Sequence, residues 1–110
     1  MDNNELKIKF ANLSGKIDIA KSQGEDTTPL LKEKIELLQI GYKKLQEALK
    51  EDRYEKNPKK YSTLLSYLNN IKAIQNEINI PTSETDKEIL NIYSQMEKAG
   101  LGWLLKNIQH

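Results

Sequence analysis

The sequence has no cysteine, one histidine and no long apolar run, and each absence excludes a class of protein. Without cysteine there is no disulfide framework and no thiolate metal site, which suits a reducing cytosol. The only histidine is His110, so this chain alone cannot build a histidine general base or a zinc cluster. No stretch approaches the roughly 18 apolar residues of a membrane-spanning helix, and the polar residues 1–5 do not resemble a signal peptide. We therefore expect a cytoplasmic protein.

The charges nearly cancel, because 17 basic and 16 acidic residues give a net charge of +1. A protein that neutralises several phosphates carries a clear basic excess, so nucleic acid is not an expected partner. The nearest candidate for a phosphate-binding loop, Gly100-Leu101-Gly102, lacks the lysine and the preceding strand that such a loop needs. Burial on an apolar stripe could raise the pKa of a carboxyl group, but carboxylates such as Glu33 and Glu47 do not lie on the stripes. We expect no catalytic residue, no cofactor and no metal.

Apolar residues at helical spacing are what the sequence has in plenty. Residues 28–53 predict a long amphipathic helix, because their apolar residues recur at alternating four- and three-residue steps: Leu31, Ile35, Leu38, Tyr42, Leu45 and Leu49. Thr28 is a candidate N-cap whose hydroxyl would accept a bond from a first-turn N–H, and Pro29 then stands at the first helical position. At 1.5 Å per residue this helix would span roughly 39 Å and project beyond its neighbours.

Three further segments show the same spacing and predict helices at residues 4–22, 58–80 and 83–99. Asn57 before a proline repeats the signature of a cap followed by proline at the first helical position. Gly100 stands where a left-handed C-terminal cap would end the last helix.

Together these segments predict the fold class. Four amphipathic helices with short polar links, no strand pattern and no internal repeat favour an all-α, antiparallel up-down-up-down four-helix bundle. With 110 residues the chain is large enough for one core and too small for two. We expect a single domain and a monomer, with the bundle at residues 4–100 and a short apolar C-terminal tail at residues 101–110. The tyrosines fall mostly at or beside core positions, which favours core filling over stacking on bases.

The tail is unusual because apolar residues crowd a chain end that is normally polar: Leu101, Trp103, Leu104, Leu105 and Ile108. Two interpretations remain open. The tail either folds back and plugs one end of the bundle, or it offers an apolar patch to a membrane or protein partner. We favour folding back with Trp103 at the rim, and we take Leu101, Trp103, Leu104 and Lys106 as candidate partner-binding residues. The tail is mostly apolar and has no arginine or serine to read base edges, which disfavours a helix-turn-helix.

A mild basic excess surrounds the end of the predicted long helix. The simpler interpretation is a solvated helix end stabilised by pairs of opposite charge. The alternative is attraction to an anionic membrane surface or to an acidic partner. Lys50, Arg53 and Lys56 are therefore further candidates for partner binding.

The order of the elements and several short runs are similar to those of a known family. The runs are residues 35–45, residues 64–68, Ile80-Pro81-Thr82, and Ile89-Leu90 followed by residues 98–102. Over roughly residues 13–102 the chain resembles the small cytosolic immunity proteins that protect producers of class IIa, pediocin-like bacteriocins, most of all the enterocin A immunity type.

The resemblance implies an antiparallel four-helix bundle that works without enzymatic activity. It implies action from the cytoplasmic side, with peripheral association at the inner face of the membrane. There the protein would recognise the membrane components of the mannose phosphotransferase system with bacteriocin bound, and block the pore. It also implies that the C-terminal half sets which bacteriocin is countered. The alternative, from another class, is a small helical adaptor that binds another protein, or a DNA-binding regulator.

Overall fold

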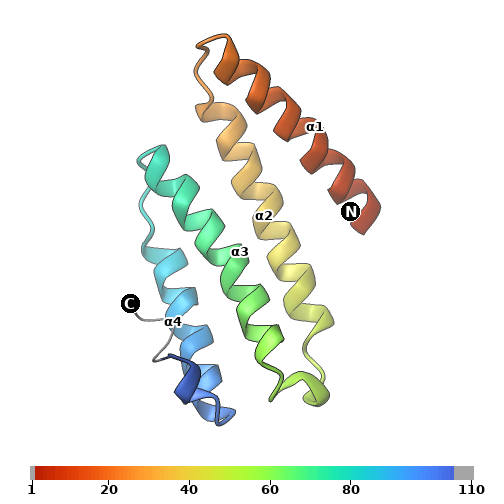
Figure 1. Ribbon diagram of the computed structural model, residues 1–110, viewed down its shortest axis with the longest axis vertical. Coiled ribbons are helices and arrows are strands. Elements are labelled where there is room, and N and C mark those ends of the chain that lie inside the picture. The colour runs from red at the N-terminus through yellow and green to blue at the C-terminus, as the bar shows by residue number, and fades with distance from the viewer. Residues whose placement is uncertain (1, 106–110) are drawn as a thin grey trace.

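The computed structural model describes residues 2–105, and this part of the chain folds into four α-helices. They are α1 (Asn3–Ser22), α2 (Thr28–Ala48), α3 (Pro58–Glu77) and α4 (Ser83–Lys98), and two short 3₁₀ helices, η1 (Asp52–Tyr54) and η2 (Gly102–Leu104), follow α2 and α4. Consecutive helices run antiparallel (Figure 1). No strand occurs among the described residues. The predicted all-α, up-down-up-down four-helix bundle is confirmed.

The helices pack in the order in which they occur along the chain. The main contacts join α1 to α2, α2 to α3 and α3 to α4, while α1 and α4 lie at opposite sides of the molecule (Figure 1). The described part of the molecule measures 49 × 31 × 20 Å. Its radius of gyration of 15.7 Å exceeds the roughly 13 Å of a compact domain of this length. The bundle is therefore open, and α1 packs mainly against α2.

Local signals set most of the helix ends. The Asn57 side chain accepts a hydrogen bond from the Lys59 N–H at 3.0 Å, so it caps α3 as predicted. Gly100 has φ +80° and directly follows Ala99, the C-cap residue of α4, which confirms the left-handed turn expected there. Asn79, with φ 59°, occupies the same left-handed region after α3. Asparagine tolerates this conformation better than most other side chains.

The start of α2 differs in detail from the prediction. Thr28 donates its hydroxyl to Asp26 Oδ1 at 2.7 Å and its N–H to the same oxygen at 3.0 Å. The prediction that the Thr28 hydroxyl accepts a capping bond is thus wrong, because Asp26 supplies the acceptor. These two hydrogen bonds hold the pKa of Asp26 below its usual value. Pro29 stands in the first turn of α2, as expected.

The end of α2 also differs, because the helix stops at Ala48 and not at Arg53. Glu51 is extended, with φ −66° and ψ 144°, and η1 follows it. The Tyr61 hydroxyl donates a hydrogen bond to the Glu55 carbonyl, which ties this connection to α3. The expectation that a long helix projects beyond its neighbours is therefore wrong.

The core consists of two clusters that meet at α3. One lies between α1, α2 and the second half of α3: Leu6, Leu13, Ile17, Leu31, Ile35, Leu37, Leu38, Ile71 and Ile74. The other joins the first half of α3 to α2, α4 and the tail: Tyr42, Tyr61, Leu64, Leu65, Leu68, Ile89, Ile92, Met96, Ala99, Leu101 and Leu105. Tyr67 packs against both clusters. Leu45 of the predicted α2 stripe and Phe10 of α1 are only half-buried, because they border a hollow between α1, α2 and α3.

Candidate functional site

Gly100 turns the C-terminal tail back onto the bundle. The Gly100 N–H bonds to the Glu97 carbonyl at 3.0 Å, and the Leu101 N–H bonds to the Met96 carbonyl at 2.8 Å. Leu101 and Leu105, on either side of η2, are 8% and 7% exposed and belong to the core cluster of α3 and α4. Of the two interpretations left open by the sequence, folding back is confirmed for residues 101–105.

Trp103 is the exposed side chain of this docked segment. It is 60% exposed, whereas Leu104 is half-buried against the core. Tryptophan offers a large apolar area together with one N–H donor, and here it does so from a fixed backbone. Leu101 leaves almost no surface for a partner because it is buried, so its predicted contact role is replaced by a structural one. Lys106, also a predicted contact residue, lies outside the described residues.

Lys50, Arg53 and Lys56 lie in the connection between α2 and α3, and all three are exposed. The Arg53 Nε lies 2.8 Å from Glu51 Oε2, and its guanidinium carbon lies 4.7 Å from the centre of the Tyr54 ring. The Arg53 and Glu51 side chains are 68% and 65% exposed, so this ion pair contributes little to stability. The segment is a solvated turn and not a helix end, and its charges remain open to a partner.

The connection with η1 and the tail with η2 lie at the same end of the bundle (Figure 1). The reason is topological, because α2 and α4 run in the same direction and both regions follow their C-terminal ends. A hollow of about 360 Å³ lies beside them, lined by Lys50, by Lys60 of α3 and by Gln95 of α4. The fold thus brings the two groups of predicted site residues to one end of the molecule, with Lys106 alone left outside the described part.

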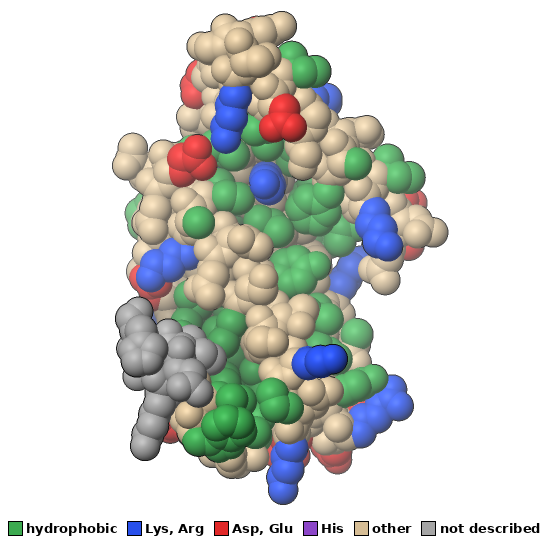
Figure 2. Space-filling view, in the orientation of Figure 1, with side chains coloured by type: hydrophobic (Ala, Val, Ile, Leu, Met, Phe, Trp, Pro, Cys, Tyr) green, Lys and Arg blue, Asp and Glu red, His purple; other side chains and the backbone are tan. Residues whose placement is uncertain are grey.

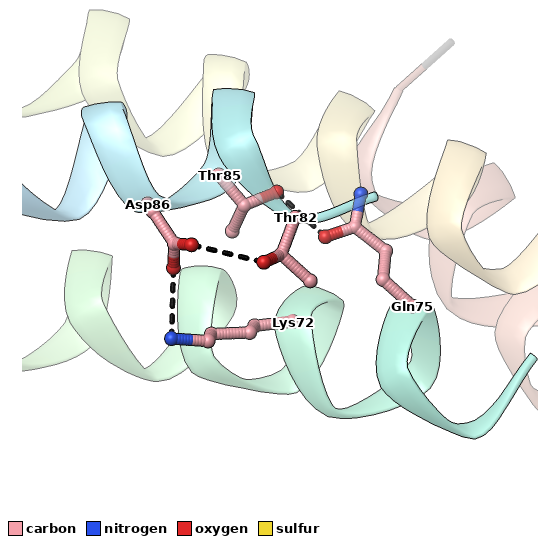
Figure 3. A network of polar contacts seen from close by, with 5 residues as sticks. All are labelled: Lys72, Gln75, Thr82, Thr85 and Asp86. Atoms are coloured by element: carbon pink, nitrogen blue, oxygen red, sulfur yellow. Dashed lines mark hydrogen bonds and ion pairs between the residues drawn. The ribbon is translucent and has the colours of Figure 1, made fainter. Parts of the chain in front are cut away.

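Two polar contacts join the start of α4 to α3 (Figure 3). In the first, Lys72 Nζ of α3 lies 2.8 Å from Asp86 Oδ1, and the Thr82 hydroxyl in the turn before α4 also donates to Asp86, to Oδ2 at 2.9 Å. In the second, the buried Thr85 hydroxyl of α4 donates to Gln75 Oε1 of α3 at 2.8 Å. Sequence reasoning missed both contacts. The sequence holds a signal for the second contact only, which is Gln75, a polar residue on the apolar side of α3.

A third polar contact links α2 to α4. The Tyr42 hydroxyl donates to Glu88 Oε1 at 2.7 Å, and Gln46 Nε2 donates to the Tyr42 hydroxyl at 2.9 Å. Burial and the hydrogen bond to Glu88 raise the pKa of Tyr42 well above its usual value. The phenol therefore stays protonated as a donor, which suits a structural role in holding α4 against α2.

The described residues do not provide a metal site of side chains: no group of three or more His, Cys, Asp or Glu among them could hold an ion. None of their helices combines the length and the apolar character needed to cross a membrane. No protein-family model, curated protein or solved structure matches the chain. Inference about function therefore starts from the chain's own surface, where the end of the bundle with Trp103 stands out.

Proposed function

We propose that this protein is an immunity protein that protects a bacterial cell from a pore-forming, pediocin-like bacteriocin. The observation that carries the proposal is the exposed Trp103 on a tail that is pinned by Leu101 and Leu105. The open four-helix bundle and the runs at residues 35–45 and 64–68 that resemble the immunity family add support.

The proposed mode of action is recognition and not catalysis. From the cytoplasmic side, the protein binds the membrane components of the mannose phosphotransferase system once bacteriocin is bound, and it blocks the pore. Because the tail is already docked, it loses less conformational entropy on binding than a free peptide would. A tryptophan in such a pose is a frequent hot spot, where truncation costs about 2 kcal/mol or more. Lys50, Arg53 and Lys56 at the same end would attract an acidic or anionic target.

The test is expression in a strain that is sensitive to pediocin-like bacteriocins, with survival scored against a panel of them. We expect the parent to protect against at least one member and Trp103→Ala to lose that protection while melting within a few degrees of the parent. The matched control is Ile19→Ala, which truncates a side chain that is 58% exposed, near 60% for Trp103, on α1. The control should keep full protection.

The outcomes distinguish a contact role of Trp103 from a purely structural role, and they also test the proposed function itself. Loss of protection by Trp103→Ala in proportion to a loss of melting temperature would make Trp103 only a plug of the core. Full protection by Trp103→Ala would remove it from the contact surface. Sensitivity of the parent to every bacteriocin in the panel, with the protein soluble and abundant, would overturn the proposed function.

A further inference from the structure

A groove runs along α2 where α1 and α3 flank it. It consists of two open hollows of about 340 Å³ and 350 Å³. Its floor is one stripe of α2, with residues at alternating four- and three-residue steps: Lys34, Leu38, Gly41, Leu45 and Ala48. Phe10 of α1 and Tyr67 of α3 border both hollows, so the two hollows adjoin at these side chains. No residue of α4 or η2 is among the lining residues, so the groove is separate from Trp103.

Gly41 lets the Tyr67 ring lie directly against α2. A Cβ at position 41 would stand 2.9 Å from Tyr67 Cε1 and 3.1 Å from its hydroxyl oxygen, which is too close for any other residue without movement of the ring. Glycine inside a helix costs about 1 kcal/mol relative to alanine, and this close approach accounts for it. Tyr67 and Phe10 are both half-buried, so each presents part of an aromatic ring to the groove.

The charged residues that line the groove have one sign. Its charged lining residues are Lys7, Lys34 and Lys44, and neither hollow is lined by Asp or Glu. Within residues 2–105 none of these lysines forms an ion pair. Figure 2 shows hydrophobic side chains gathered over the middle of one face of the molecule, with basic side chains among them.

We propose that this groove binds an amphipathic helix of a protein partner, with apolar side chains turned toward α2 and Asp or Glu along its edges. Lys34 and Ala48 are 14 residues apart on α2. The groove is therefore about 21 Å long, which is the length of four helical turns. Apolar side chains one or two turns apart on the guest helix would enter the hollows on either side of Phe10 and Tyr67. Carboxylates on its edges would meet the three lysines.

Other occupants fit less well. In a second copy of the chain, the exposed large apolar residues of α1 are Ile8 and Ile19. They are 11 residues apart and so lie about three helical turns from each other, which is too far for neighbouring hollows. Exposed Leu90 of α4 offers a single apolar side chain. A lipid surface meets protruding residues, whereas Leu6 and Leu38 in the groove are only 7% and 8% exposed. The proposal does not depend on the role of Trp103.

The test uses the full chain and two synthetic helical peptides of about 18 residues, long enough to form a helix on the groove. Both carry leucine at helical spacing, and their edges carry glutamate in one and lysine in the other. We expect the glutamate peptide to bind about tenfold more tightly than the lysine peptide at low salt. The three lysines of the groove attract the first peptide and repel the second. Amide NMR shifts should change around Phe10, Gly41 and Tyr67.

Charge reversal identifies the site. The double variant Lys34→Glu/Lys44→Glu should reverse the preference between the peptides, whereas Lys9→Glu/Lys16→Glu, with the same change in net charge on the outer side of α1, should keep it. If the first double variant does not fold, Lys7→Glu serves in its place, because Lys7 is exposed. This variant should bind the glutamate peptide several-fold more weakly than the parent does.

Four results would overturn the proposal. They are equal binding of both peptides, binding of neither, NMR shifts confined to α4 and the tail, and occupation of the groove by a second copy or by anionic phosphatidylglycerol vesicles in place of the peptide. Peptide binding at the groove and survival against bacteriocins are measured separately. The parent could fail to bind either peptide and still protect against bacteriocin, so failure of this proposal is distinguishable from failure of the proposed function.

Discussion

Asp86 interacts with two partners at once, Lys72 on α3 and Thr82 in the turn before α4. The hydrogen bond from Lys72, and after it the one from Thr82, favour the ionised carboxylate and hold the pKa of Asp86 below 3.8. The side chains of Lys72 and Asp86 are 41% and 42% exposed, so solvent screens part of their attraction. This one residue therefore gives the contact between α3 and α4 a modest dependence on acid pH.

We predict that Asp86→Asn lowers the melting temperature at neutral pH, by less in acid. A carboxyl whose folded pKa is depressed contributes stability above its unfolded pKa, here 3.8, and loses it as the pH falls through the folded value. The gap between parent and variant should be constant above about pH 5 and should close below pH 3.8. Thermal unfolding followed by circular dichroism across this range measures the gap.

Glu84→Gln is the matched control for this prediction. The Glu84 side chain is 90% exposed and lies 3.8 Å from Lys87 on its own helix, so it should show no comparable gap at any pH. If the Asp86→Asn gap were the same at acid and neutral pH, the ion pair would not be its cause.

α3 contributes to both core clusters, and its N-terminus is set by a single side chain. Asn57 accepts a hydrogen bond from the Lys59 N–H through its side chain, while its own N–H bonds to the Tyr54 carbonyl at 3.0 Å. The residue thus ends the η1 connection and begins α3. Its cap satisfies a first-turn N–H that would otherwise lack a partner within the helix.

We predict that Asn57→Ala destabilises the protein by about 1 kcal/mol, because the cap is lost while the packed face of α3 is unchanged. In a domain of this size the melting temperature should fall by about 4 °C. Urea denaturation measures the free energy of unfolding. Asn57→Asp should retain most of the stability, because a carboxylate can accept the same bond.

Asn69→Ala separates capping from the general effect of alanine. Asn69 is exposed within α3, and alanine is a better helix former, so this control should be neutral or slightly stabilising. Equal destabilisation by both variants would show that the cap is not the cause.

At the scale of the whole molecule, charge gathers where the connection after α2 meets the docked tail. Exposed charges act over a Debye length of roughly 8–10 Å and affect the rate of association more than the fold. The basic side chains at this end therefore act on encounter with a target.

We predict that reversing Lys50, Arg53 and Lys56 to glutamate leaves the melting temperature nearly unchanged and weakens association with the target membranes at low salt. All three side chains are exposed, and the Arg53 ion pair is screened, so little stability is at stake. Cosedimentation with membranes from a bacteriocin-treated sensitive strain, at low and high salt, measures association.

Reversal of Lys9, Lys16 and Lys32 is the control, because these exposed residues on α1 and α2 give the same change in net charge. The control should associate nearly as well as the parent. Unchanged association of the first variant at low salt would contradict a steering role for this end of the molecule.

Local signals in the sequence were sufficient for the helices and for most of their ends. Apolar spacing placed four helices, Asn57 before proline marked the start of α3, and Gly100 marked the turn after α4. These features depend on residues within a turn of each other, so a single sequence carries them. The candidate contact at Trp103 was likewise visible as an apolar residue in an unusual place.

The tertiary structure alone decided where the apolar residues would be covered. The apolar stripe of α2 continues to Leu49, yet the helix ends at Ala48 and the connection is bonded to α3 through Tyr61. Phe10 stands on the same stripe as Leu6 and Leu13 but remains half-buried. Helical spacing determines which side of a helix is apolar, whereas burial depends on which neighbours lie against it. Because α1 and α4 lie at opposite sides of the bundle, α4 does not cover the stripe of α2 that runs from Lys34 to Ala48. A groove remains there, and it could be seen only once the helices were placed in space.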